Sequence, residues 1–343
     1  MGFERSYQVK IPSNQINRKR WYTTTSLTTS QLSEKPNLIM NPWFLSGLID
    51  AEGCFTIGIV RNKELKTGWV IKPRFQISLH KKDLALLELI QSTLRIGNIN
   101  KQRAEAFQFR VDSIKDLKAL FNHFEKYPLI YQKLRDYLLF KQALDLIFIK
   151  EHLTMNFLPK TDASSGLREI VAIKAAMNNG LPAPLKAVFT HLKSVNRPRI
   201  DNISIPDPQW LSGFASGEGC LLIRIKKSNT HKLGFLVELV FQINQHIRDK
   251  ELILNLVKYL NCGVVYKHSD NAVVFRVSKL SDLTQKIIPF FLMNPILGVK
   301  SKDFYDFCIV ANIMKEKGHL TTEGLHQIRK IKDGINTGRK FED

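Results

Sequence analysis

Hydrophobic and polar residues alternate over several short stretches of the chain. Between residues 69 and 79 one set of alternate positions is mostly apolar, and the other set carries Lys72, Arg74, Gln76 and Ser78. Three further stretches alternate in the same way, residues 107–111, 220–226 and 273–277. A period of two is that of a β-strand with one buried face. We therefore expect antiparallel strands whose second face is exposed, polar and basic.

Longer stretches between and after these strands have the 3.6-residue period of amphipathic helices. They pair up along the chain as residues 82–94 and 249–260, 113–124 and 279–290, and 130–150 and 298–317. Each half of the chain then consists of a helix, two strands, a helix, two strands and further helices. This order predicts an α+β fold in which helices cover the apolar face of a four-stranded antiparallel sheet.

The whole pattern occurs twice. Residues 45–54 read LSGLIDAEGC and residues 211–220 read LSGFASGEGC, so six of ten positions are identical at a displacement of 211 − 45 = 166. Matches continue downstream, and one residue of slippage then aligns Lys133 with Lys300 and Asp136 with Asp303. Such a duplication predicts two similar halves related by a pseudo-twofold axis.

The repeat divides the chain into four parts. Residues 41–180 and 208–343 are the two copies, and residues 181–207 are a proline-containing linker that we expect to be ordered but irregular. Residues 1–40 contain six basic residues, only two acidic ones and a Ser/Thr-rich stretch. That composition is typical of mitochondrial transit segments and predicts a mitochondrial location. A flexible leader fused from an upstream reading frame is the alternative.

The chain carries a large positive charge. Lys and Arg number 51 and Asp and Glu number 31, which leaves 51 − 31 = +20 and a pI of about 9.8. This excess indicates a polyanionic partner and argues against an ordinary metabolic enzyme. Twofold-related halves of this charge suit duplex DNA, whose backbone has similar symmetry. No apolar run reaches the roughly 18 residues of a membrane span, and the four cysteines lack the spacing of a structural zinc site.

Each copy begins with a short apolar segment that has small residues four positions apart and ends in a glutamate. These residues are Gly47, Ala51 and Glu52 in the first copy and Gly213, Gly217 and Glu218 in the second. Small residues at this spacing let two helices pack closely, which brings the carboxylates together. Paired carboxylates need divalent cations, and oxygen ligands suit Mg²⁺. Asp50 is a rival acid, but its counterpart is Ser216, so it cannot form a symmetric pair.

The segments LSGLIDAEG and LSGFASGEG resemble the two signature helices of the LAGLIDADG homing endonucleases, in the single-chain subclass with two motifs. The resemblance covers about residues 41–340. It implies two αββαββα units, joined at the paired motif helices, whose sheets form a saddle over DNA. It also implies a monomeric, Mg²⁺-dependent enzyme, encoded within a mobile intron, that hydrolyses one phosphodiester on each strand of a long, loosely pseudo-palindromic site and leaves short 3′ overhangs.

The same resemblance assigns roles to individual residues. It implies that Glu52 and Glu218 bind the metals, and that the preceding Ala51 and Gly217 belong to the same metal sites. Mn²⁺ is expected to replace Mg²⁺, and Ca²⁺ to support binding without cleavage. Gln76 and Gln242, each 24 residues after its glutamate (76 − 52 and 242 − 218), are expected to position water or, alternatively, to contact a base.

Lys101 and Lys267 are related by the repeat and are the expected basic residues of the two active sites. Their register leaves alternatives open. Tyr266 rather than Lys267 can face the site, and both lysines suit ordinary phosphate contacts equally well.

We expect the polar strand faces to read the DNA sequence. Arg can hold guanine through two hydrogen bonds, and each good pair discriminates by about 1–3 kcal/mol. The predicted DNA-contacting residues are Arg61, Asn62, Lys72, Arg74, Gln108, Arg110, Arg224, Lys226, Glu238, Asn244 and Arg276. By contrast, we interpret His80, His246, His152 and His319 as structural, and Asp83 and Asp249 as helix-capping or first-turn acids.

Two alternatives keep this fold and change its activity. An intron maturase would bind intron RNA and assist splicing, alone or in addition to DNA cleavage. A regulator with a decayed nuclease site would bind DNA without cutting it. The presence of both glutamates favours the enzyme.

Overall fold

The computed structural model describes residues 40–65, 67–153, 165–200 and 204–339. The predicted leader lies outside these residues except for Met40. Within the described ranges, no helix is both long enough and apolar enough to cross a membrane.

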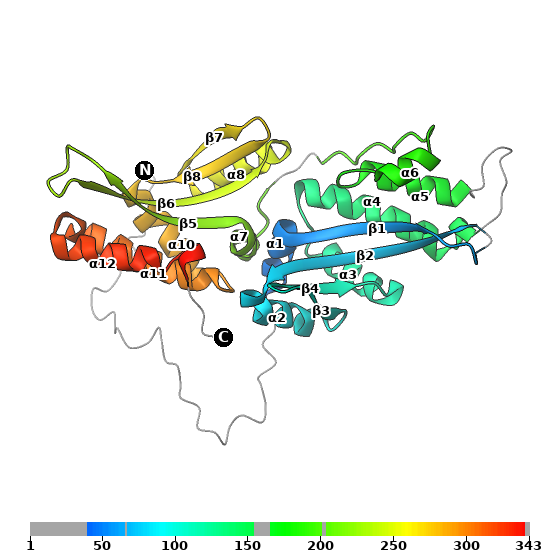
Figure 1. Cartoon of the computed structure of the whole chain (residues 1–343), viewed down its shortest axis with the longest axis horizontal. Helices are drawn as coiled ribbons and strands as arrows, with labels where there is room; N and C mark the ends of the chain where they lie inside the picture. The colour runs from blue at the N-terminus through cyan, green and yellow to red at the C-terminus, as the bar shows by residue number, and fades with distance from the viewer. Residues whose placement is uncertain (1–39, 66, 154–164, 201–203, 340–343) are drawn as a thin grey trace, which may run out of the picture. The chain divides into compact units, whose positions relative to one another are not determined.

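The first half contains one antiparallel sheet with strand order β1-β2-β4-β3 and helices on its apolar face (Figure 1). Its elements are α1 (Pro42–Glu52), β1 (Gly53–Arg61), β2 (Trp69–His80), η1 (Lys81–Asp83), α2 (Leu84–Leu94), β3 (Asn98–Arg103), β4 (Ala106–Val111), α3 (Ile114–Lys126), α4 (Tyr131–Phe148), η2 (Glu151–Leu153) and α5 (Ser165–Ala176).

The second half repeats this arrangement with strand order β5-β6-β8-β7. Its elements are α7 (Pro208–Glu218), β5 (Gly219–Lys227), β6 (Phe235–His246), η3 (Ile247–Asp249), α8 (Lys250–Leu260), β7 (Val264–Ser269), β8 (Ala272–Val277), α9 (Leu280–Asp282), η4 (Leu283–Ile287), α10 (Ile288–Met293), α11 (Lys300–Lys315), η5 (Gly318–Leu320), α12 (Thr322–Asp333) and η6 (Asn336–Gly338). The α+β fold with two similar halves is thus as predicted.

Burial along the strands follows the alternation in the sequence. In β2, Phe75 and Ile77 are fully buried, whereas Lys72 and Ser78 are exposed. Each fully buried side chain of this kind stabilises the fold by roughly 1.5–3 kcal/mol. One face of each sheet therefore forms a core with the helices, and the other carries mostly polar side chains, with Val240 and Val274 of the second sheet as buried exceptions.

Both motif helices, α1 and α7, begin and end in the same way. The side chains of Asn41 and Asp207 accept hydrogen bonds from the first turns, and a proline follows each cap. Gly53 and Gly219 end the helices in an extended conformation. As a result β1 and β5 start directly after the two glutamates.

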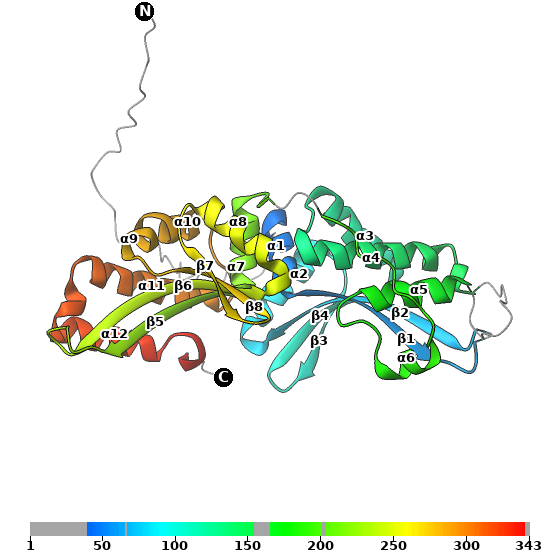
Figure 2. The same ribbon diagram turned by 90° about the horizontal axis from the view of Figure 1, so that it is seen from above.

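The motif helices cross at their glycines and lie side by side in Figures 1 and 2. A Cβ on Gly47 would lie 1.9 Å from the carbonyl oxygen of Trp210, and one on Gly213 would lie 2.0 Å from that of Phe44. Because 213 − 47 and 210 − 44 both equal 166, these are the same contact made in both directions. The pairing is therefore pseudo-twofold, and only glycine permits this approach of the two backbones.

The linker contains regular structure where we predicted an ordered but irregular segment. It contains the short helix α6 (Ala183–Val188), and Leu185 and Phe189 are buried against the first half. The ring of Phe189 packs on that of Trp69, with 5.6 Å between centroids. This helix is too short for its apolar residues to show a helical period.

The helix predicted over residues 279–290 is divided into three shorter elements. It consists of α9, a π-helical turn at η4, and α10. Pro289 has no N–H to donate to the preceding turn, which accounts for the local change in hydrogen bonding.

Candidate active site

The glutamates end the two paired helices, and Glu52 lies close to the partner helix α7. A Cβ on Gly217 would lie 3.1 Å from Oε1 of Glu52 and 2.5 Å from Cβ of Ala51. Burial raises the pKa of both Glu52 and Glu218; a hydrogen bond from Gln245 opposes the shift at Glu218, and the charge of Glu52 adds to it. The helix pair therefore brings both carboxylates into one electrostatic site.

Two lysines to which we assigned no role from the sequence also lie at this site. Lys133, near the start of α4, donates a hydrogen bond to the carbonyl oxygen of Gly53. Lys300, the first residue of α11, donates to the carbonyl oxygens of Gly217 and, at 3.3 Å, Ala215. Each ammonium group thus binds the carbonyl oxygen of a residue directly adjacent to a motif glutamate.

The charges of these lysines act on the carboxylates. Both Lys133 and Lys300 lower the pKa of Glu52 and Glu218, against the larger effect of burial. Burial in turn lowers the pKa of Lys300, while the two glutamates oppose that shift. The alignment of Lys133 with Lys300 in the repeat was the sequence signal that could have identified them.

A cavity of about 470 Å³ lies beside this site, and residues of both halves line it. Glu52 and Lys300 line it, with Asp83 from the first half and Ser216 and Asp303 from the second. The glutamate of one half and the lysine of the other therefore face a common space.

The glutamines lie in equivalent rows across the two sheets. The residues directly opposite them are Cys54 and Arg110 for Gln76, and Cys220 and Arg276 for Gln242. Arg276 donates to Oε1 of Gln242 at 3.3 Å and lies 5.2 Å from the ring of Tyr266. Both glutamines are on the polar face near the start of β1 or β5, and their part in catalysis stays a prediction.

Lys101 and Lys267 are on the other face of their sheets. Lys101 is directly opposite Phe107, and Lys267 is opposite Val273, so each shares the face that the helices cover. The ammonium group of Lys267 pairs with Asp270 at 2.7 Å. The structure therefore does not place these lysines on the glutamine face. A register shift follows each lysine. The alternation in β3 and β7 is too short to reveal which face each lysine occupies.

Asp112 organises the polar face of the first sheet. Its carboxylate pairs with the Nε of Arg74 at 2.7 Å and with the Nε of Arg110. Gln108 is largely buried and donates to the hydroxyl of Ser78 at 3.1 Å. The two arginines are thus held in place, while Gln108 is less accessible than its position on a polar face suggests.

The remaining predicted contacts of this half lie toward the β1–β2 hairpin. Lys72 is exposed. The guanidinium of Arg61 lies 5.1 Å from the ring of Trp69, and Oδ1 of Asn62 accepts the N–H of Glu64 at 3.0 Å. Asn62 therefore shapes the loop as well as facing solvent.

Glu238 has the corresponding role on the second sheet. It pairs with Lys226 at 3.1 Å and with Arg224 at 3.8 Å. Asn244 is exposed on the same polar face. The counterpart of Glu238 is Lys72, since 238 − 166 = 72, so the halves present different charge patterns.

Asp50 has a structural role. It is buried, accepts the N–H of Ile130 at 3.1 Å and the indole N–H of Trp210 at 2.7 Å, and burial raises its pKa well above the usual range. The hydroxyl of Ser216 accepts the N–H of Leu297, the equivalent of Ile130, at 3.1 Å. Asp50 and Ser216 therefore hold the same backbone segment, just before the helix that carries each lysine.

Asp83 and Asp249 are first-turn acids of η1 and η3, one of the two predicted roles, whereas the capping role is not seen. Both occupy the first position before a helix, but neither side chain makes a cap hydrogen bond. Asp83 instead accepts the N–H of Val299 of the second half at 2.7 Å, and Asp249 pairs with Arg248 at 3.5 Å. At Asp83, a hydrogen bond from the second half takes the place of a capping bond to its own helix.

The histidines have structural surroundings. Nδ1 of His80 accepts the N–H of Lys82, and Nδ1 of His246 accepts that of Arg248, both at 3.2 Å. His152 and His319 lie in η2 and η5, and burial lowers the pKa of both.

Both segments that form the site match one family model. The model, described as LAGLIDADG endonuclease, matches residues 45–144 and again residues 211–311. The chain is also 41% identical over 324 residues to a Neurospora crassa protein named probable intron-encoded endonuclease 3. That alignment covers 93% of this chain but only 57% of the relative, so the chain spans less than two thirds of the relative's length.

Two solved structures are similar over nearly their whole length. The I-SmaMI LAGLIDADG homing endonuclease bound to cleaved DNA has a TM-score of 0.83 and 44% identity, covering 88% of this chain and 98% of that chain. I-SmaMI bound to an uncleaved DNA target in the presence of calcium ions has a TM-score of 0.82 and 44% identity, covering 87% and 99%. With its two motif helices, duplicated sheets and paired glutamates, the chain belongs to the LAGLIDADG endonuclease family.

Proposed function

We propose that the protein is a site-specific homing endonuclease that cuts both strands of duplex DNA. The observation that carries this proposal is the pair of half-buried glutamates at the ends of two crossed helices, with a lysine beside each helix end. The cleaved DNA bound to I-SmaMI supports duplex DNA as the substrate. Because both motif helices belong to one chain, a single molecule supplies the complete site and acts as a monomer.

The site suits hard divalent cations, with Mg²⁺ as the cofactor. Burial raises the pKa of Glu52 and Glu218, so a cation between them would stabilise their charged forms. The carbonyl oxygens of Ala51 and Gly217 would complete this ligand set. The Gly217 oxygen also accepts a hydrogen bond from Lys300 and has a second lone pair for a metal. When bound, the metal lowers the pKa of water and stabilises charge on a phosphoryl oxygen.

Other divalent ions should separate binding from cleavage. We expect Mn²⁺ to replace Mg²⁺ and Ca²⁺ to support DNA binding without cleavage. The structure of I-SmaMI with an uncleaved target and calcium ions supports the second expectation.

We assign the basic residue of each active site to Lys133 and Lys300, in place of Lys101 and Lys267. Their ammonium groups lie at the turns that carry the glutamates, where they would counter the negative charge that develops on the phosphate. Gln76 and Gln242, on the polar sheet face, would hydrogen-bond a water or a nearby base.

We propose that the two polar sheet faces read a long, loosely pseudo-palindromic target. Asp112 orients arginines on the first sheet, whereas Glu238 orients a lysine and an arginine on the second. Since the halves present different groups, the two half-sites should differ in sequence. The relatives compared are named as endonucleases, which favours DNA cleavage over assistance to RNA splicing.

A mitochondrial location is part of the proposal. It is supported by the acid-poor composition of residues 1–40 and by the intron-encoded fungal relative. Expression of the full chain with a fluorescent C-terminal fusion checks whether an imported form reaches mitochondria, and cytosolic fluorescence alone would exclude import.

The test of the active site uses single Glu→Gln variants on a cleavable target. Glu52→Gln and Glu218→Gln each remove a charged metal ligand while keeping the side-chain size. We expect both to abolish double-strand cleavage in Mg²⁺ while the dissociation constant for DNA in Ca²⁺ changes little. The exposed Glu323 of α12 provides the matched control, because Glu323→Gln should cut normally. Full cleavage by either motif variant would refute the assignment.

A further inference from the structure

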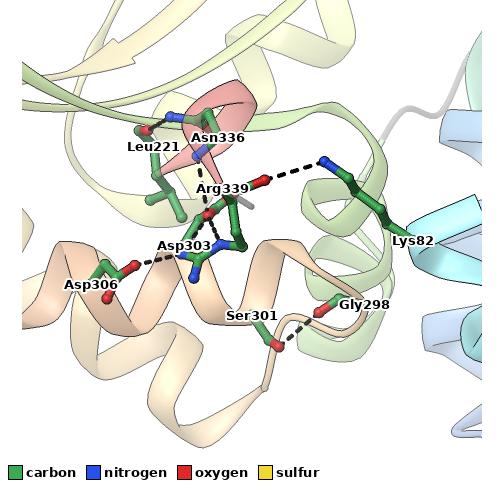
Figure 3. Close-up of polar contacts among 8 residues, drawn as sticks. All are labelled: Lys82, Leu221, Gly298, Ser301, Asp303, Asp306, Asn336 and Arg339. Atoms are coloured by element: carbon green, nitrogen blue, oxygen red, sulfur yellow. Dashed lines mark hydrogen bonds and ion pairs between the residues drawn. The ribbon is translucent and has the colours of Figure 1, made fainter. Parts of the chain in front are cut away.

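Each half contains a buried aspartate that links three separate segments, and Figure 3 shows the one in the second half. Asp303 of α11 accepts the N–H of Asn336 at 3.2 Å and hydrogen bonds from Nε and Nη2 of Arg339 at 2.9 and 2.7 Å. The side-chain amide of Asn336 donates to the carbonyl oxygen of Leu221 on β5 at 2.8 Å. These contacts tie α11, β5 and the segment after α12 together.

The first half contains the same arrangement. Asp136 of α4 accepts the N–H of Asn178 at 3.3 Å and a hydrogen bond from Nη2 of Arg197 at 2.9 Å. The amide of Asn178 donates to the carbonyl oxygen of Phe55 on β1 at 2.8 Å. We call each set of Asp, Asn and Arg a clamp, the first being Asp136, Asn178 and Arg197.

The second clamp comprises Asp303, Asn336 and Arg339. Both asparagines have a left-handed backbone, with φ of 47° at Asn178 and 56° at Asn336, a conformation that asparagine tolerates better than most residues. The two arginines come from non-equivalent segments, since Arg197 belongs to the linker and Arg339 follows the last helix. The same connection is thus made in both halves with differently placed arginines.

Each clamp spans the two elements that carry the site. In the second half Lys300 precedes Asp303 by three residues on α11, and Leu221 follows Glu218 by three residues at the start of β5. The clamp therefore connects the helix that bears the lysine to the strand that follows the glutamate. In the first half, Lys133 likewise precedes Asp136 by three residues, and Phe55 follows Glu52 by three residues.

The ion pairs inside the clamps are buried, which makes their geometry demanding. Asp136 and Asp303 are 6% and 5% exposed. A carboxylate at this depth is costly unless it is paired and hydrogen-bonded. Arg197 also donates to the carbonyl oxygen of Ala176 at 2.6 Å, and Arg339 also pairs with Asp306 at 2.5 Å. Each arginine is therefore held at two points and fixes the carboxylate it binds.

We propose that the two clamps position the two active sites independently. The first joins the helix that bears Lys133 to the strand that follows Glu52, and the second joins the helix that bears Lys300 to the strand that follows Glu218. This inference rests on the proposed function, because it assumes that these groups act on DNA. The clamp members are positioning residues that act through the helix bearing each lysine, and Asp303 also lines the cavity that Glu52 and Lys300 share.

The test compares Arg197→Met with Arg339→Met, each of which keeps an unbranched apolar stem and removes the guanidinium and its charge. Cleavage of a supercoiled plasmid that carries the target is followed with each strand labelled separately. We expect each variant to cut one strand about 10- to 100-fold more slowly, the scale of a misplaced active-site group. The slow strand should be opposite in the two variants, so that nicked circles accumulate. The affinity for DNA in Ca²⁺ should not change.

Two further variants separate positioning from folding. Asn178→Gly and Asn336→Gly permit the left-handed backbone and keep the N–H that Asp accepts, and they delete only the bond to the strand. They should give the same strand preference with smaller effects. Arg329→Met, at an exposed position on α12, is the control and should cut both strands at the wild-type rate.

Several outcomes would overturn the inference. Equal slowing of both strands, in step with a lower unfolding temperature, would show that the clamps only stabilise the fold. Unchanged cleavage in all clamp variants would show that they do not position the site. If the wild-type protein cuts neither strand, the proposed function itself fails, a result distinct from either of these.

Discussion

At the scale of single residues, each motif glutamate is accompanied by a lysine that binds the backbone of the same turn. Lys133→Met and Lys300→Met remove the ammonium group and keep most of the apolar stem. We expect each to slow cleavage by about 10²- to 10³-fold, the usual effect of losing one electrostatic donor to a transition state. Single-turnover rates at saturating enzyme provide the measurement.

The corresponding controls are Lys101→Met and Lys267→Met, on the helix-covered face of the sheets. They should alter DNA affinity modestly and leave the single-turnover rate near that of the wild type. An equal loss of rate in all four variants would contradict the choice of Lys133 and Lys300.

The charged glutamates should also destabilise the metal-free protein. Folding raises the pKa of both, so the native state binds more protons than the unfolded chain, and stability falls as pH rises through the raised values. We expect the unfolding temperature in chelator to decrease between mildly acidic and neutral pH. The decrease should be smaller in a variant with both Glu52→Gln and Glu218→Gln.

Adding Mg²⁺ at neutral pH should then raise the unfolding temperature of the wild type alone, because the metal binds only the native carboxylate pair. Calorimetry in chelator and in Mg²⁺ measures both effects. If the unfolding temperatures of the wild type and the double variant depended on pH in the same way, burial would not destabilise the charged glutamates.

Equivalent positions in the two copies guided the choice of site residues, although they also led to Lys101 and Lys267, which lie on the helix-covered face. Glu52 and Glu218 were identified because Asp50 has no acidic counterpart, and the structure gives Asp50 a purely structural position. Lys133 and Lys300 were aligned as well, but their proximity to the glutamates depends on how α4 and α11 pack on β1 and β5. No spacing along the chain encodes that packing.

At the scale of elements, the fold depends on the contact between α1 and α7. Gly47→Ala and Gly213→Ala would each press a methyl group against backbone atoms of the partner helix, 1.9 and 2.0 Å from a carbonyl oxygen. Overpacking typically costs about 1–3 kcal/mol, and rigid backbone neighbours favour the upper end. Chemical denaturation should therefore show a clear loss of stability in both variants.

Gly58→Ala is the matched control for the helix contact. A Cβ at Gly58 on β1 would have its nearest neighbour at 3.3 Å, so the substitution needs only a small adjustment. We expect its stability to stay close to that of the wild type. If Gly47→Ala is as stable as Gly58→Ala, the motif helices do not cross as closely as described.

Elements with long, regular patterns were predicted within a few residues, as in the strand over residues 69–80 and the helix over residues 131–148. Elements shaped by a single residue or by distant contacts were not. Pro289 interrupts one predicted helix, and the short helix α6 forms where Leu185 and Phe189 bury against the first half. Lys101 faces away from the glutamines because it pairs with Phe107, and the short, mostly polar sequence of β3 does not reveal that register.

At the scale of the whole molecule, the charge of +20 should make DNA binding strongly salt-dependent. Each phosphate neutralised by Lys or Arg releases counterions, so contact with six or more phosphates should lower affinity by roughly 10³-fold or more between about 50 and 200 mM salt. Titrations in Ca²⁺ at several salt concentrations measure this slope. A flat response would place the excess charge away from the DNA.

The most direct test of the central claim is selection of cleaved duplexes from a randomised DNA library in Mg²⁺. The control is the variant in which both Glu52 and Glu218 are replaced by Gln. The account predicts that the wild-type protein enriches one long, loosely pseudo-palindromic site, cut on both strands with short 3′ overhangs, and that the double variant enriches nothing. Failure of the wild type to cut any duplex, or the same cleaved site from the double variant, would contradict it.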